Sequence, residues 1–111
     1  LNVDKMREAA NLILGAHDFM AFCGNKKMKK STIRTVTAID IEENEDEIQI
    51  LYTGDGFLQQ MIRIMTGTLI EVGNGTKQPN DIVTILESKD RQNAGYTVPA
   101  EGLILKSVTY E

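Results

Sequence analysis

Several residue types are scarce in this 111-residue sequence, and each scarcity excludes a class of protein. Cysteine occurs once, as Cys23, so the chain can build neither a disulfide framework nor a cluster of thiolate metal ligands. Histidine also occurs once, as His17, and no third group stands out to orient it as a base for Cys23. We therefore expect both residues to be structural, and we expect no metal site.

Long apolar runs are absent as well. No stretch approaches the roughly 20 apolar residues that a membrane-spanning helix needs, and no charged start leads into a cleavage site. These absences favour a soluble, cytoplasmic protein without membrane contact. The chain begins with Leu1 and Asn2 rather than methionine, which suggests a piece of a longer protein. Its length suits a single domain over residues 1–111.

Basic residues do not outnumber acidic ones. The net charge of −4 argues against a protein that coats nucleic acid without selectivity. The charges are segregated, however: Lys26, Lys27, Lys29 and Lys30 lie in a run without acids, and an acidic run over 40–47 follows. The acidic run is interpreted as a solvated hairpin tip. The basic run stays open between a solvated loop and a contact to phosphates.

Hydrophobic periodicity predicts the order of the secondary structure. Apolar residues at helical spacing predict helices over 3–15, 57–72 and 79–89, with Asn2 capping the first helix and Gly15 ending it. Alternating apolar and polar residues predict strands over 32–42, 47–53 and 103–110, and residues 17–31 are expected to form a loop. The order α-β-β-α-α-β indicates an α+β fold, an antiparallel sheet with helices packed on one face.

Arg63 is the charged residue in an otherwise uncharged stretch of the second predicted helix. On a helical wheel it lies away from the main apolar face, in line with Gly67 and Ile70. A plain surface arginine is one interpretation. The small Gly67 beside an apolar neighbour favours another, in which a second surface such as a partner domain covers this side. Arg63 would then be a buried guanidinium that needs an acid.

Four blocks of the sequence together resemble one enzyme family. They are GAHDFMAFC over 15–23, TIRTV over 32–36, GFLQQMIRIMTG over 56–67 continuing to EVGNG over 71–75, and KDR over 89–91 with PAEGLIL over 99–105. In this order they resemble the motif blocks of tRNA pseudouridine synthases of the TruA class. Asp55, Ile64 and Tyr96 depart from the family pattern without altering the arginine or the Gly102-Leu103 pair.

The resemblance implies a parent enzyme that isomerises uridine to pseudouridine in the anticodon arm of tRNA, as a homodimer and without a cofactor. It also implies that the indispensable aspartate and an active-site tyrosine come from the N-terminal half of the parent, and nothing in this chain matches either. The chain would be the C-terminal half. It would supply Arg63 to pair with the aspartate, Leu103 to pack beside the target base, and the lysines of residues 26–30 to contact the RNA backbone. Alone, it would be inactive.

Two other interpretations stay open from the residues alone. One is a non-catalytic RNA-binding module, but the three tyrosines and three phenylalanines form no paired aromatic pattern on a strand. The other is a small-ligand or regulatory α+β domain, which the composition does not exclude. An Arg-Thr-Asp motif in the parent sequence ahead of Leu1 would decide for the synthase.

Overall fold

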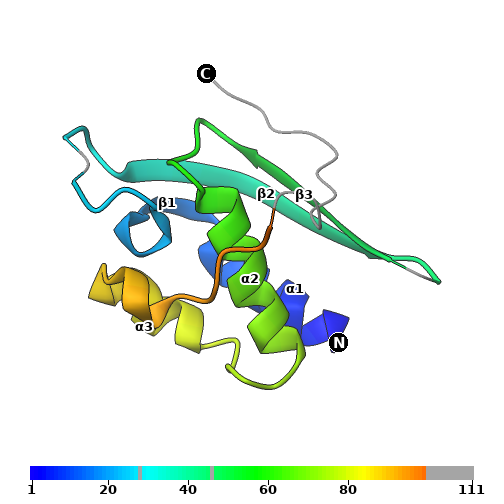
Figure 1. Cartoon of the computed structure of the whole chain (residues 1–111). Coiled ribbons are helices and arrows are strands. Elements are labelled where there is room, and N and C mark those ends of the chain that lie inside the picture. Colours follow the sequence, from blue (N-terminus) through cyan, green and yellow to red (C-terminus); the bar gives the residue numbers. More distant parts are fainter. Residues whose placement is uncertain (28, 46, 100–111) are drawn as a thin grey trace.

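The fold is given by a computed structural model that describes residues 1–27, 29–45 and 47–99. Within these ranges the helices are α1 (Val3–Ile13), α2 (Met61–Gly73) and α3 (Asp81–Ser88), and the strands are β1 (Gly15–Asp18), β2 (Ile33–Glu43) and β3 (Ile48–Gly54). Short 3-10 turns are η1 (Met20–Phe22) and η2 (Arg91–Asn93). The antiparallel sheet has the order β1-β2-β3, and the helices lie against one face of it (Figure 1). The predicted α+β class is confirmed.

Helix α1 begins where the sequence predicts but ends earlier. The Asn2 side chain accepts a hydrogen bond from Lys5 N at 3.1 Å and so caps the helix. Leu14 is already extended, and Gly15, with φ 104°, opens strand β1 instead of closing the helix. The predicted order of elements omitted β1 and assigned residues 17–31 to a loop. This strand is 4 residues long and its burial does not alternate, so it carries no period-2 pattern.

The later helices are also shorter than predicted. Helix α2 starts after residue 57, because Gln60, directly before it, lies in the left-handed region with φ 59°. Helix α3 starts at Asp81 rather than at residue 79. Strands β2 and β3 form close to their predicted bounds. The predicted closing strand over 103–110 lies outside the described residues. In the described part of the chain, no helix is both long and apolar enough to cross a membrane.

The core lies between the sheet and the helices. Its largest fully buried side chains come from α1, α2, α3, the sheet and the segment around η1: Met6, Ile13, Phe19, Phe22, Val36, Tyr52, Met61, Ile64, Met65, Leu69, Val72 and Ile82. Helix α2 contributes the most of these residues, so its position is fixed by burial of its apolar side. The remaining side of α2 is the one that carries Arg63.

One hydrogen-bonded pair inside this core is polar. The Thr66 hydroxyl on α2 donates to Ile62 O at 2.8 Å, and the hydroxyl of Tyr52 on β3 lies 2.7 Å from Thr66 Oγ1. Burial raises the pKa of Tyr52 above its ordinary value of 10.0, and the bond to Thr66 opposes this shift only in part. Tyr52 is therefore a neutral structural group that ties the sheet to α2.

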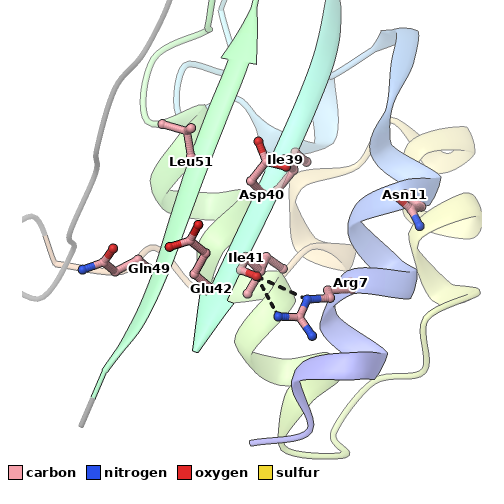
Figure 2. Close-up of a pocket in the computed structure, with 8 residues that line it drawn as sticks. All are labelled: Arg7, Asn11, Ile39, Asp40, Ile41, Glu42, Gln49 and Leu51. Carbon is pink, nitrogen blue, oxygen red and sulfur yellow. Dashed lines mark hydrogen bonds between the residues drawn. The ribbon is translucent and has the colours of Figure 1, made fainter. Parts of the chain in front are cut away.

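Strand β2 is longer than either of its neighbours. Strand β1 pairs only with Ile33–Val36, and farther along the same edge α1 takes its place. Arg7 on α1 donates to Ile41 O from Nε at 3.2 Å and from Nη2 at 2.8 Å, while its Nη1 lies 3.4 Å from the Asp4 carboxylate. This guanidinium helps to line a cavity of about 500 Å³ formed with residues of β2 and β3. Figure 2 shows the residues that line it.

Candidate active site

Arg63 lies in the first turn of α2 and is half-buried. Its Nε donates to Val98 O at 2.7 Å, and its own carbonyl accepts a hydrogen bond from Val98 N at 3.2 Å. A residue 35 positions later in the chain therefore holds both the backbone and the side chain of Arg63. These two hydrogen bonds fix the position of Arg63 Nε and restrict the directions in which Nη1 and Nη2 can point.

Val98 belongs to residues 94–98, a segment here called the strap, which crosses α2 (Figure 1). Gly95 N donates to Thr68 Oγ1 at 2.8 Å, and Tyr96 N donates to Glu71 Oε2 at 3.0 Å. Together with the bonds between Val98 and Arg63, these contacts join the strap to α2 at three positions between residues 63 and 71. The strap runs along the helix side that the core does not use.

Gly67 allows the strap to lie this close. A Cβ built on Gly67 would be 1.9 Å from Tyr96 O, which no side chain could tolerate without moving the backbone of the strap. The sequence prediction that a second surface covers the side of α2 marked by Gly67 is therefore correct in kind. The partner domain suggested for that role is not what touches Gly67: the covering backbone comes from the chain itself.

The terminal nitrogens of Arg63 are left without an acceptor among the described residues. The ion pairs found there join Arg7 to Asp4 and Lys77 to Glu71, and neither involves Arg63. With Nε already bonded to Val98 O, the two amino groups Nη1 and Nη2 form the unused fork of the guanidinium. Such a fork matches the two oxygens of a carboxylate.

The lysines of the basic run all lie on the surface. Lys26, Lys27, Lys29 and Lys30 are exposed in the loop between η1 and β2. This loop is tied to the start of α2, because Gly24 N donates to Gln59 O at 2.9 Å. The structure therefore brings the lysine loop to the same end of α2 as Arg63, although no contact between them is present in the described ranges.

Comparison with known proteins identifies the family. The sequence profile of a family described as tRNA pseudouridine synthase matches residues 9–111. The chain belongs to this family. The tRNA pseudouridine synthase A of Clostridium acetobutylicum is 50% identical over 110 residues, that of Bacillus sp. (strain KSM-64) is 48% identical over 110, and that of Bacillus subtilis (strain 168) is 44% identical over 111.

These matches cover 99%, 99% and 100% of the chain but only 45% of each relative. The chain thus spans about half the length of the pseudouridine synthases that it matches. The region around α2 and the strap lies inside the segment matched by the family profile.

The sequence also singled out Leu103 as a residue of the base pocket, and Cys23 and His17 as structural residues. Leu103 lies outside the described residues. Cys23 and His17 have separate main-chain partners: Cys23 Sγ lies 3.4 Å from Asn25 O, and His17 Nε2 donates to Leu14 O at 2.9 Å. This separation agrees with the structural interpretation of both. In the described ranges, no three His, Cys, Asp or Glu side chains gather as they would around a metal ion.

Sequence reasoning missed the residues that hold the strap. Arg91 on η2 donates from Nη1 to Gly95 O at 2.8 Å and from Nη2 to Thr97 Oγ1 at 3.0 Å. Glu71 accepts from the strap and pairs with Lys77 at 3.3 Å. The KDR block contains Arg91, yet nothing local shows that its side chain reaches forward to fix the backbone.

Proposed function

We propose that the parent protein is a tRNA pseudouridine synthase that acts on uridine in the anticodon arm of tRNA, with this chain as its C-terminal half. The half-buried Arg63, whose fork has no acceptor among the described residues, is the observation that carries the proposal. Family membership supports the reaction, because relatives matched over nearly the whole chain are named tRNA pseudouridine synthase A. The same membership favours this function over a regulatory or small-ligand domain.

Arg63 would serve the aspartate contributed by the N-terminal half. Two charge-assisted hydrogen bonds from Nη1 and Nη2 would favour the ionised carboxylate that acts on the uridine and would fix its direction. The bond from Nε to Val98 O, at 2.7 Å, supports this role because it aims the fork without consuming it. A lysine would supply the charge but not the planar, two-pronged geometry.

The reaction is an isomerisation and needs no cofactor. The bond between C1′ of the ribose and N1 of the base breaks, the base turns over, and a bond from C1′ to C5 replaces it. The proton lost from C5 balances the one gained at N1. Before this the uridine must leave its stack, at a cost of roughly a few kcal/mol. Leu103 is proposed as the apolar wall that packs beside the extruded base.

The lysine loop would contact the phosphate backbone of the tRNA. Its exposed ammonium groups lie at the same end of α2 as Arg63, so one RNA substrate could meet both. Contacts to phosphates carry no base sequence, which suits an enzyme that modifies several neighbouring uridines. We further propose that the parent acts in the cytoplasm as a homodimer.

The test is conservative substitution of Arg63 in the full-length parent. Arg63→Lys should preserve folding and most tRNA affinity but lower the single-turnover rate by roughly two or more orders of magnitude, because orientation and charge stabilisation contribute on that scale. Arg7→Lys is the matched control, since Arg7 also binds a main-chain carbonyl but lies at the α1–β2 edge. Wild-type turnover in the Arg63 variant would end the proposal and return the regulatory-domain alternative.

A further inference from the structure

We propose that Arg91 is a positioning residue for Arg63 and acts on it through the strap. The inference rests on the proposed function, because it concerns how Arg63 is aimed at its carboxylate. Arg91 does not reach Arg63 in any contact of the described residues. Its guanidinium instead donates hydrogen bonds to two atoms of the strap, Gly95 O at 2.8 Å and Thr97 Oγ1 at 3.0 Å.

These two points lie shortly before Val98, the strap residue that binds Arg63. The earlier part is held to α2 by the bonds of Gly95 N and Tyr96 N. Thr97 directly precedes Val98, whose carbonyl accepts from Arg63 Nε. By fixing both Gly95 and Thr97, Arg91 sets the curve of the backbone between them. The direction of the Val98 carbonyl follows from that curve.

The packing under the strap makes this curve stiff. A Cβ on Gly95 would lie 2.5 Å from Glu71 Oε2 and 2.7 Å from the Cα of Thr68, just as one on Gly67 would meet Tyr96 O. Backbone therefore lies on backbone on both sides of the contact, with little room to slide. If Thr97 were displaced, the strap could not move against α2 to compensate, so Val98 would be displaced as well.

The shape of arginine suits this task. One planar guanidinium reaches a carbonyl and a hydroxyl at once, in a fixed relation. A lysine at position 91 would keep the positive charge but has a single nitrogen to place between the two acceptors. Arg91 is half-buried and lies outside the buried apolar cluster, so the exchange should leave the core in place.

The experiment measures single-turnover and steady-state kinetics of Arg91→Lys, Arg63→Lys and the double variant in the full-length parent. Arg91→Lys should lower kcat by roughly tenfold to a hundredfold with KM for tRNA changed by less than about twofold, because small misplacement of a catalytic group is costly. The double variant should be no slower than Arg63→Lys alone, since both changes spoil the same interaction. Arg7→Lys again controls for loss of an arginine bond to a main-chain carbonyl.

Each result decides between the claims. Wild-type kcat in Arg91→Lys, beside an impaired Arg63→Lys, overturns this inference and leaves the proposed function standing. Losses that multiply in the double variant also overturn it, because Arg91 would then act independently of Arg63. Normal turnover in Arg63→Lys defeats the proposed function itself. Should Arg91→Lys fail to fold, Thr97→Val removes one acceptor alone, and its smaller loss must likewise vanish in the Arg63→Lys background.

Discussion

Arg7 and Arg63 each bind a main-chain carbonyl of a distant residue, and they differ in how many of their other hydrogen-bond donors the described residues use. At the α1–β2 edge, Arg7 donates from Nε and Nη2 to Ile41 O (Figure 2). Its Nη1 lies 3.4 Å from the Asp4 carboxylate, so each of its three nitrogens has a partner within the fold. At the start of α2, Arg63 gives only Nε to Val98 O. Its terminal nitrogens find no acceptor among the described residues.

The comparison separates an arginine whose donors serve the fold from one that keeps two donor groups without an acceptor among the described residues. Both side chains are anchored, so anchoring alone does not distinguish them. They differ in the number of hydrogen-bond donors left over. Arg63 uses only Nε among the described residues, so Nη1 and Nη2 remain to bind the two oxygens of a carboxylate. The following predictions change one region while keeping the other as a reference.

The largest effect is expected when the aspartate proposed to pair with Arg63 is absent. The 111-residue chain alone contains both arginines but no match to the aspartate of the family motif, so it should release no tritium from tRNA labelled at C5 of uridine. The full-length parent, assayed in parallel, is the positive control. Release above a blank without enzyme would show that the nucleophile resides in this chain.

Adding a methyl group under the strap should disturb the Arg63 region and spare the Arg7 region. Gly67→Ala drives a Cβ into Tyr96 O, so we expect a loss of about 1–3 kcal/mol in stability from overpacking and a fall of roughly a hundredfold in turnover. Gly73→Ala on the same helix is the control, because its Cβ would face the flexible end of Met6 at 2.8 Å. Denaturant midpoints and single-turnover rates measure both. Equal behaviour of the two variants would contradict a rigid strap.

Charge reversal extends the comparison from the arginines to the lysines near them. Changing Lys26, Lys27, Lys29 and Lys30 to glutamate in the parent should weaken different tRNAs similarly, by about tenfold or more, and should lower the log–log salt slope by up to about three.

The control is Lys5→Glu, an exposed lysine on α1 at the Arg7 end. It should leave the salt slope of tRNA binding unchanged. Filter binding over a series of salt concentrations gives both slopes. An unaltered slope in the four-lysine variant would return that loop to the solvated interpretation.

The smallest effect concerns the hold of α2 on the sheet, apart from the strap. Tyr52→Phe removes the bond to Thr66 and should cost about 1 kcal/mol of stability with turnover unchanged. Because burial raises the pKa of Tyr52 above 10.0, the unfolded chain loses this proton first as pH rises. Wild-type stability should therefore decline more steeply above pH 10 than that of the variant. Parallel pH profiles from denaturant titrations would contradict the assignment.

Periodicity and capping residues correctly predicted the elements whose conformation depends on their own sequence. The helices, β2, β3 and the cap at Asn2 follow from periodicity and capping chemistry. Strand β1 does not, because its pairing is set by a partner across a long loop: Gly15 lies opposite Val36 and Asp18 opposite Ile33. A strand this short acquires its conformation from the register of β2 rather than from its own residues.

The candidate site divides in the same way. The helical wheel separated Arg63 from the apolar side of α2, and the family resemblance suggested its role. Such reasoning did not find the strap, because its contacts with α2 join residues 25, 27 and 35 positions apart. Gly67 was the one local sign of it. A glycine on a helix shows that something lies close, but not which segment it is.

The free part of the β2 edge has a consequence for the protein in concentrated solution. A bare row of strand N–H and C=O groups can recruit a strand from another molecule and start aggregation. Beyond Val36, α1 lies along this edge and Arg7 occupies Ile41 O, while the exposed carboxylates of Asp40 and Glu42 flank it. A second copy that approached this edge would find Ile41 O already bonded to Arg7. Its own acidic side chains at the same positions would also be repelled by Asp40 and Glu42. Strand β2 can therefore extend past β1 without recruiting a strand from another molecule.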